Sequence, residues 1–149
     1  GIPLIINDRL DIAMAAGADG VHLGQKDLPL EKAREIAPKG MIIGISAESV
    51  EDAAQAEAGG ADYVGVSPVF LTPTKRDTAR PQGLEGVRRF RESVGIPVVG
   101  IGGINRSNAG EVIRAGADGV AVVSAIMSAP DPERAARELL TLIREVEAE

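Results

Sequence analysis

Short apolar runs alternate with amphipathic segments along the whole chain. The runs are continuously apolar, which is typical of parallel strands that are covered on both faces. Six runs are predicted strands: Pro3–Ile6, Gly20–Leu23, Met41–Ile45, Tyr63–Val66, Val98–Ile101 and Val120–Val123. The segments that carry apolar residues at helical spacing are predicted helices: Arg9–Ala16, Leu30–Ala37, Val50–Ala58, Leu84–Val94, Ser107–Ala115 and Pro132–Val146. The pattern therefore predicts six βα units in series.

Three of the predicted helices end in nearly the same sequence. These joints are Gly17-Ala18-Asp19, Gly60-Ala61-Asp62 and Gly116-Ala117-Asp118. Glycine readily takes the left-handed conformation that stops a helix, so we interpret the repeats as turn chemistry. A recurring joint between helix and strand supports the series of βα units.

Six such units fit either an open doubly wound sheet or part of a (β/α)8 barrel. A doubly wound sheet gathers its site at one crevice, whereas a barrel ligand meets the carboxyl end of every strand. Polar residues follow nearly every predicted strand: Asn7-Asp8, Gln25 to Asp27, Ser46, Ser67 to Lys75, Gly102-Gly103 and Ser124. We therefore predict one α/β domain over residues 1–149, a TIM barrel represented by its strands 3 to 8. Because the chain starts directly at a strand, we expect the first two βα units to be missing from it.

Composition narrows the classes of ligand. The formal net charge of -6 provides no basic field that would recruit a nucleic acid. The absence of cysteine excludes disulfides and thiolate metal sites. No apolar run is long enough to span a membrane and no signal peptide is visible, so we expect no membrane partner and a cytoplasmic location. A small phosphate ester remains compatible, because a few backbone amides and one or two cations can bind it.

The long connection Ser67–Gly83 is the first candidate site. It exceeds the usual length between a strand and the next helix, and long ordered loops tend to be functional. Thr72 and Thr74 place two hydroxyls beside the ammonium of Lys75, a combination that suits a phosphorylated ligand. The alternative is a solvated surface loop. If the loop binds ligand, we expect it to close over the site.

Two aspartates that follow neighbouring strands are candidate metal ligands. Asp8 and Asp27 together could hold Mg²⁺, which is often bound by one or two carboxylates with phosphate and water. Asn7 would then donate to a phosphate oxygen. The alternative for Asp8 is a cap on the following helix. His22 is the only histidine and lies within a predicted strand, where we expect it to be packed and hydrogen-bonded.

Three further strand ends are candidate phosphate contacts. Ser46 could bind phosphate or cap the next helix, and no histidine pattern in the sequence supports it as a nucleophile. The run from Gly100 to Asn105 could bring backbone amides to an anion, or be a tight turn. Val123 and Ser124 follow the last predicted strand. In barrels the loops after strands seven and eight commonly share a phosphate, which favours a joint site.

In these motifs the chain resembles the thiamine-phosphate synthase family, also called thiamine phosphate pyrophosphorylases, from Gly1 to the final helix. The resemblance rests on Ile6 to Arg9, His22 to Asp27, Gly44 to Ser46, Thr72 to Lys75, Gly100 to Ile104, and Val123-Ser124. It implies a (β/α)8-barrel transferase that couples a hydroxymethylpyrimidine diphosphate to a thiazole phosphate. The products are thiamine phosphate and pyrophosphate, and the partners are small molecules. The oligomeric state stays open, with a homo-oligomer possible.

The resemblance also implies a role for each matching position. Mg²⁺ is expected on Asp8 and Asp27, and the pyrimidine diphosphate on Asn7, Ser46 and Lys75. The expected contacts of the thiazole phosphate are Thr72, Pro73, Thr74, Gly102, Gly103, Val123 and Ser124. Lys75 and Ser46 are the expected catalytic residues. The implied mechanism is dissociative: pyrophosphate leaves, a pyrimidine-methyl cation forms, and the thiazole nitrogen captures it.

The chain departs from the family in one respect, and three different functions compete with the synthase. The family's basic diphosphate motif follows its second strand, which this chain lacks, so we expect little activity from the chain alone.

The related thiazole tautomerases are expected to carry histidine after the Ser46 position, where this chain has Ala47. A second competing function is that of a non-catalytic barrel that binds thiazole phosphate. The third is a phosphate-binding isomerase of amino-acid biosynthesis, which would not explain the Asp8 and Asp27 pair.

Overall fold

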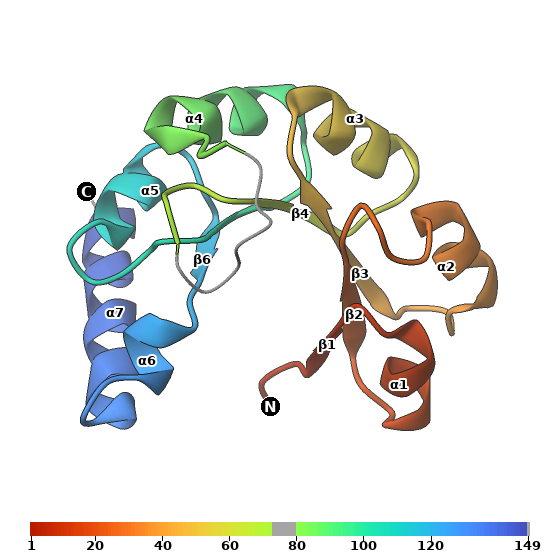
Figure 1. Cartoon of the computed structure of the whole chain (residues 1–149), viewed down its shortest axis with the longest axis horizontal. Coiled ribbons are helices and arrows are strands. Elements are labelled where there is room, and N and C mark those ends of the chain that lie inside the picture. The colour runs from red at the N-terminus through yellow and green to blue at the C-terminus, as the bar shows by residue number, and fades with distance from the viewer. Residues whose placement is uncertain (73–79, 149) are drawn as a thin grey trace.

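Six parallel strands form one sheet that curls into an arc (Figure 1). The computed structural model describes residues 1–72 and 80–148. The strands follow one another in sequence order across the sheet: β1 (Ile5–Asn7), β2 (Gly20–Leu23), β3 (Ile42–Ala47), β4 (Tyr63–Val66), β5 (Val98–Ile101) and β6 (Gly119–Ala121). This is a TIM-like α/β half-barrel, in agreement with the predicted fold class.

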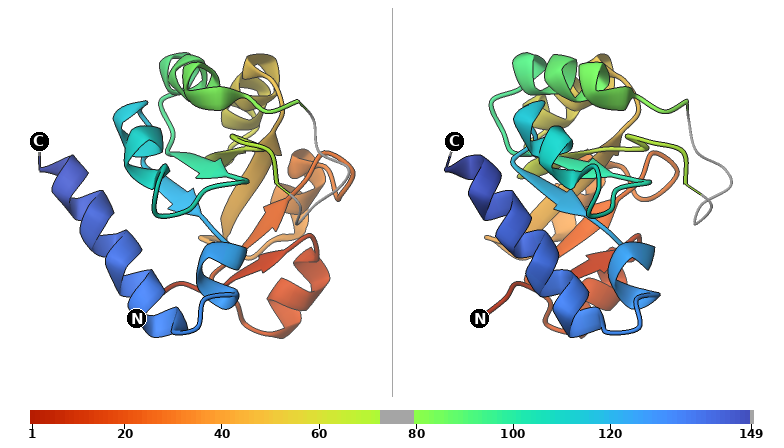
Figure 2. Two further views of the ribbon diagram at one scale, coloured as in Figure 1. Left: turned by 60° about the vertical axis from the view of Figure 1, so that its left-hand side comes forward. Right: turned by 90° about the vertical axis from the view of Figure 1, so that its left-hand side faces the viewer.

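Helices cover the convex side of the arc, and the concave side stays open (Figures 1 and 2). They are α1 (Leu10–Ala15), α2 (Leu30–Ile36), α3 (Val50–Ala58), α4 (Gly83–Ser93), α5 (Ala109–Arg114), α6 (Ser124–Met127) and α7 (Pro132–Glu147). The core lies between the sheet and these helices, where Val64 and Val66 of β4 and Val87 of α4 are fully buried. The edge strands β1 and β6 are only partly buried, because each has a paired neighbour on one side only.

The predicted elements agree with the structure except at some of their ends. In the middle of the sheet, β3 starts one residue later than predicted and continues to Ala47, so it contains Ser46. Strand β1 begins two residues later than predicted and includes Asn7, and β6 ends at Ala121 instead of Val123. The short helix α6 was not predicted, because one turn is too short to show a helical period. It starts at Ser124, so the last polar strand end is also the beginning of a helix.

The three repeated joints turn the chain as predicted, since Gly17, Gly60 and Gly116 all have positive φ angles of 62°, 85° and 105°. The aspartates have a second role that the sequence did not indicate. Each carboxylate accepts a hydrogen bond from a backbone N–H in or just before the preceding strand, and the aspartate's own N–H donates to the carbonyl of the same residue. The pairs are Asp19 with Leu4, Asp62 with Ile43, and Asp118 with Val98. These bonds link β1 to β2, β3 to β4, and β5 to β6.

Arginines from the helix layer hold two of these aspartates. Arg34 of α2 donates to Asp62 and to the carbonyls of Gly60 and Met41. Arg91 of α4 donates in the same way to Asp118 at 2.8 Å and to nearby carbonyls. Both arginine side chains are about 30% exposed, so these ion pairs are partly shielded from water.

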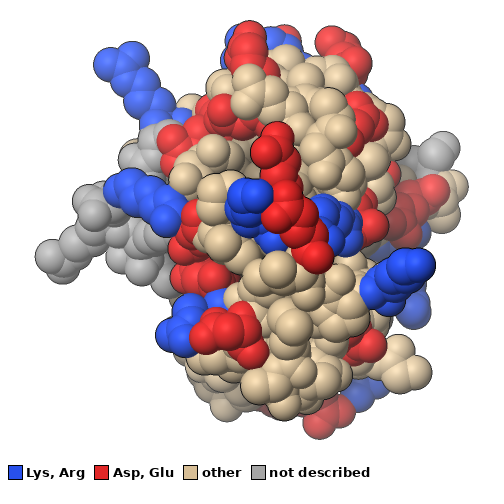
Figure 3. Space-filling view, turned by 90° about the vertical axis from the view of Figure 1, so that its right-hand side faces the viewer, with Lys and Arg blue, Asp and Glu red and all other residues tan. Residues whose placement is uncertain are grey.

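The outer surface mixes charges of both signs. Figure 3 shows Lys and Arg interspersed with Asp and Glu across the face that it presents. Within the described part of the chain, no helix has the length and apolar character needed to cross a membrane.

Candidate active site

A cavity of about 870 Å³ lies at the carboxyl ends of the strands. It is lined from four places in the chain: the end of β1 and the loops that follow β4, β5 and β6. Seven of the predicted site residues line it: Asn7, Asp8, Thr72, Gly102, Gly103, Val123 and Ser124. Residues that are far apart in the sequence therefore meet in one space, because parallel strands end at the same edge of a sheet.

The two glycines after β5 make room for the loop after β4. Both have positive φ angles, 97° at Gly102 and 65° at Gly103. A Cβ at Gly102 would lie 2.8 Å from the Cβ of Pro68, and one at Gly103 would lie 2.6 Å from the carbonyl oxygen of Leu71. The backbone N–H of Phe70 donates to the carbonyl of Gly102 at 3.1 Å, so the loops are also hydrogen-bonded. The turn was predicted, whereas this close packing of two site loops was not.

Asn108 braces the glycine loop and was not predicted from the sequence. Its side-chain amide donates to the carbonyl of Gly103 at 3.0 Å, and its side-chain oxygen accepts from the N–H of Asn105 at 2.8 Å. One side chain thus ties the two ends of the turn together. An asparagine just before a helix that follows a glycine run is the signal that could have indicated it.

Asp8 does not cap the following helix, so that alternative is wrong. The N-cap of α1 is Arg9, which makes no side-chain cap hydrogen bond. Asp8 has a φ angle of +66°, an uncommon conformation that costs energy and tends to occur at functional sites. The amide of Asn7 donates to Asp8 at 2.7 Å, and the N–H of Asp8 donates to the carbonyl of His22 at 2.8 Å. These bonds hold the carboxylate beside the first two strands.

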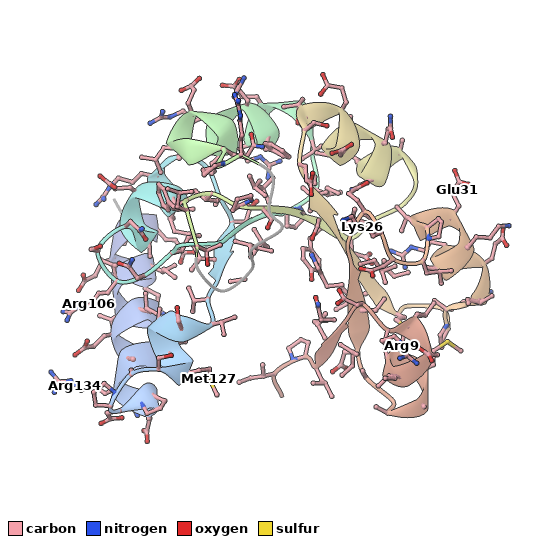
Figure 4. The ribbon with its side chains drawn as sticks, in the orientation of Figure 1. Arg9, Lys26, Glu31, Arg106, Met127 and Arg134 are labelled. Carbon is pink, nitrogen blue, oxygen red and sulfur yellow. The ribbon has the colours of Figure 1, made fainter. Side chains whose placement is uncertain are left out.

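Asp8 and Asp27 line a second cavity, of about 710 Å³, together with Arg9 and Lys26. Figure 4 labels these two cations on the same side of the arc, Arg9 at α1 and Lys26 above it. Asp27 accepts a hydrogen bond from the N–H of Gly24 at 2.6 Å, which fixes the start of the loop after β2. The two carboxylates therefore border one space, and their joint binding of an ion stays a prediction.

The donor set fits a magnesium ion better than a metal held entirely by protein. Among residues 1–72 and 80–148, no group of three or more His, Cys, Asp or Glu side chains is arranged to hold a metal. Mg²⁺ needs only one or two carboxylates when phosphate and water complete its shell. Asp8 and Asp27 provide such a pair, so the residues present fit the predicted ion.

The cation nearest to Asp8 in sequence is already engaged. Arg9 donates two hydrogen bonds to Asp11, at 2.8 and 2.6 Å. These bonds lower the pKa of the Asp11 carboxyl to about 2 and raise the pKa of Arg9. Asp11 therefore competes with any anionic ligand for the guanidinium of Arg9.

Ser46 lies beside the only histidine of the chain. Its hydroxyl is 2.9 Å from Nε2 of His22, and Nδ1 of the same ring is 2.9 Å from the hydroxyl of Tyr63. The predicted packing and hydrogen bonding of His22 are confirmed. The capping alternative for Ser46 is wrong, because the N-cap of α3 is Ser49, with Asp52 completing a capping box. The contact with His22 was not predicted from the sequence, because it depends on the pairing of β2 with β3.

Three predicted contacts, Pro73, Thr74 and Lys75, lie outside the described residues. Their roles, and the closure of the loop over the site, stay predictions. Thr72 does line the larger cavity.

Comparison with known proteins identifies the family of this chain. The sequence model of the family described as thiamine monophosphate synthase matches residues 1–126. The chain belongs to this family. Thiamine-phosphate synthases from Chloroflexus aurantiacus and Methanocella arvoryzae are 53% and 55% identical to it, each over 143 residues and 96% of the chain. The matches cover 66% and 68% of those relatives.

A solved structure within the thiamine monophosphate synthase family has the same fold. It is a thiamine phosphate pyrophosphorylase from Pyrococcus furiosus, which superimposes with a TM-score of 0.88 at 52% identity. The match covers 95% of this chain and 67% of that chain. The chain thus spans about two thirds of the length of the relatives that it matches.

Proposed function

We propose that this protein acts as a thiamine-phosphate synthase. It would couple 4-amino-2-methyl-5-hydroxymethylpyrimidine diphosphate to thiazole phosphate and release pyrophosphate. The observation that carries the proposal is the cavity at the carboxyl ends of the strands, where seven residues predicted as ligand contacts meet. Membership of the thiamine monophosphate synthase family supports the same reaction.

The proposal assigns the phosphate of the thiazole to the side of the cavity made by β5 and β6. The loops after these strands contribute Gly102, Gly103, Val123 and Ser124. Gly103 is held by Asn108 and by the packing of Leu71, so its backbone is set before a ligand arrives. A preorganised cradle of this kind binds an anion without a further ordering cost.

The diphosphate would bind across β1 to β3. Asn7, Asp8, Asp27 and Ser46 belong to the ends of these strands, and Lys75 is the proposed cation on the same ligand. Asp8 and Asp27 would hold Mg²⁺, which neutralises charge on the leaving pyrophosphate when it is bound. The reaction would be dissociative: the C–O bond to the diphosphate breaks, and the thiazole nitrogen then bonds to the pyrimidine-methyl cation. The protein needs no general base for such a step and contributes by positioning both ligands.

We also propose that β1 to β6 correspond to strands three to eight of an eight-stranded barrel. Large apolar side chains are exposed at both edges of the arc: Ile2 (96%) and Leu4 (52%) before β1, and Val123 (59%) and Met127 (74%) after β6. Figure 4 labels Met127 beside the opening. Two further βα units would cover these residues and supply the family's basic diphosphate motif.

The deciding experiment measures pyrophosphate release from the two substrates in the presence of Mg²⁺. A protein extended by two further βα units is expected to release pyrophosphate and to lose this activity when the metal is chelated, whereas the 149-residue chain alone is expected to release little. Asp27→Ala should abolish turnover under limiting Mg²⁺ while the protein keeps its thermal transition. Glu35→Ala is the matched control, because it also removes a carboxylate, but on the outer surface of α2. Equal activity of wild type and Asp27→Ala at limiting Mg²⁺ would overturn the metal assignment.

Two results would change the assigned function or its requirements. Binding of thiazole phosphate without pyrophosphate release, in a protein extended by two further βα units, would indicate a binding module. Activity only in the extended chain would show that the basic motif is required. Tautomerase activity is disfavoured by Ala47, which is fully buried and follows Ser46 on the opposite face of β3.

A further inference from the structure

Three polar side chains from neighbouring strands form a connected chain on the concave face of the sheet. Tyr63 of β4 contacts one nitrogen of His22 of β2, and Ser46 of β3 contacts the other, both at 2.9 Å. The rings of His22 and Tyr63 are also stacked, with centroids 5.4 Å apart. All three residues are half-buried, so their hydrogen bonds are partly shielded from water but border the interior of the arc.

Glycines on β3 and β4 create the space for these three side chains. In the sheet register Gly44 of β3 lies between His22 and Tyr63. A Cβ at Gly44 would lie 2.0 Å from Cζ of Tyr63, so the ring lies across β3 only because Gly44 has no side chain. A Cβ at Gly65 would lie 3.2 Å from Cε1 of His22. The sequence of two strands is therefore adapted to let these rings meet.

The hydrogen bonds from Tyr63 through His22 to Ser46 have a preferred direction. A neutral imidazole has one N–H donor and one acceptor nitrogen, so one neighbouring hydroxyl donates to the ring and the other accepts from it. Phenol is a stronger acid than an aliphatic alcohol and hence the better donor. Burial raises the pKa of Tyr63, so its hydroxyl keeps its proton. Tyr63 then donates to Nδ1, and Nε2–H donates to Ser46.

This direction leaves the proton of Ser46 for another acceptor. Ser46 lies at the carboxyl end of β3, where Gln25 of the neighbouring loop donates to its carbonyl at 2.6 Å. On the other side, Asn7 is the register partner of His22. Ser46 and Asn7, both assigned above to the diphosphate, therefore lie at the ends of β3 and β1, with His22 on the strand between them.

We propose that His22, oriented by Tyr63, is a positioning residue that makes Ser46 a hydrogen-bond donor to the anionic leaving group. The proposal rests on the synthase function, in which negative charge develops on the departing diphosphate. A fixed donor aimed at developing charge lowers the barrier of the chemical step more than it strengthens binding. His22 itself touches no ligand in this scheme.

The first test measures the tautomer of His22 by two-dimensional ¹H–¹⁵N NMR of the full chain. Because the chain has one histidine, the ring signals need no assignment. The expected form is Nε2–H in wild type, with a shift toward Nδ1–H in Tyr63→Phe, which removes only the hydroxyl. An Nδ1–H ring in wild type would overturn the proposal.

The second test is a double-mutant cycle on pyrophosphate release. Ser46→Ala is expected to lower kcat about 100-fold, the usual effect of losing one donor to developing charge. Tyr63→Phe should lower kcat roughly tenfold with little change in KM. The double variant should be no slower than Ser46→Ala, because Tyr63 acts through Ser46. Multiplied effects in the double variant would show a separate structural role and overturn the proposal.

The same experiments separate this proposal from the function on which it rests. If wild-type protein releases no pyrophosphate in either the short or the extended chain, the proposed function fails. The NMR result still decides the direction of the hydrogen bonds in that case: Nε2–H supports the polarity assigned to Ser46, and Nδ1–H refutes it. Ser46→Thr, which keeps a hydroxyl, should retain most of the activity that Ser46→Ala loses.

Discussion

The link between Asp118 and β5 should make a measurable contribution to stability. In Asp118→Ala the N–H of Val98 loses its acceptor, and Arg91 loses its carboxylate partner. Val98 is fully buried, so its donor cannot easily find water instead. The loss of both contacts should lower the free energy of unfolding much more than a typical surface substitution does.

The magnitude follows from the two contacts. A hydrogen bond to a charged group contributes about 1.5–3 kcal/mol to stability. The ion pair adds about 0–1 kcal/mol, since the Asp118 side chain is 50% exposed and solvent screens it. We therefore expect a loss of roughly 1.5–4 kcal/mol in the free energy of unfolding, or about 3–16 °C in Tm for a chain of this size.

The assay is urea unfolding followed by circular dichroism, with thermal melts as a second measurement. Asp118→Asn keeps an oxygen acceptor for Val98 and should lose about 1 kcal/mol or less. Glu35→Ala removes an exposed ion pair with Lys32 and should change stability by no more than about 0.5 kcal/mol. If Asp118→Ala is no less stable than Glu35→Ala, the carboxylate does not hold the strands together. If the Asn variant is as unstable as the Ala variant, the ion pair rather than the backbone bond is responsible.

Three further predictions concern single residues. Gly103→Ala should weaken binding of thiazole phosphate at least tenfold by calorimetry, because its methyl group would displace Leu71; unchanged affinity would refute the packing of the two loops. Ser49→Ala should cost about 1 kcal/mol in urea unfolding, the usual value for an N-cap, and a neutral effect would contradict the observed capping box. The Asp11 carboxyl should titrate at about pH 2 by ¹³C NMR, and Arg9→Ala should return its pKa toward 3.8. Since the folded pKa is lowered, this pair stabilises the fold above about pH 4 and stops doing so as the pH falls toward 2; an unchanged pKa in Arg9→Ala would refute the pairing.

The sequence predicted the sheet and its helices because buried parallel strands and amphipathic helices leave strong apolar patterns. It was least accurate at Asn7, Val123 and Ser124, where an edge strand or a single helical turn is set by local packing. Local rules also left a helix cap as an alternative for Asp8 and for Ser46, and the structure excludes both caps. A capping preference is short-range, whereas both residues are held by His22 from a neighbouring strand, Asp8 through its backbone and Ser46 through its hydroxyl.

The residues around the ligand contacts could not be predicted for a different reason. Asn108 is ordinary in sequence, and its role depends on the geometry of the turn that it spans. The contact of Tyr63 with His22 depends on Gly44, because a side chain there would occupy the space of the tyrosine ring. This effect can be recognised only once the pairing register of the strands is known. Periodicity shows which positions are apolar, but it does not show where a side chain is missing so that another can pass.

The aspartate joints bear on how such a fold can grow. They link β1 to β2, β3 to β4, and β5 to β6, while corresponding carboxylate bonds between β2 and β3 or β4 and β5 are not among those of the described residues. A gene duplication or deletion that moves two βα units together keeps every joint with its own acceptor strand. A duplication or deletion of a single unit separates an aspartate from the backbone N–H that donates to its carboxylate. Recombination in steps of two therefore preserves carboxylate bonds that single-unit steps would break.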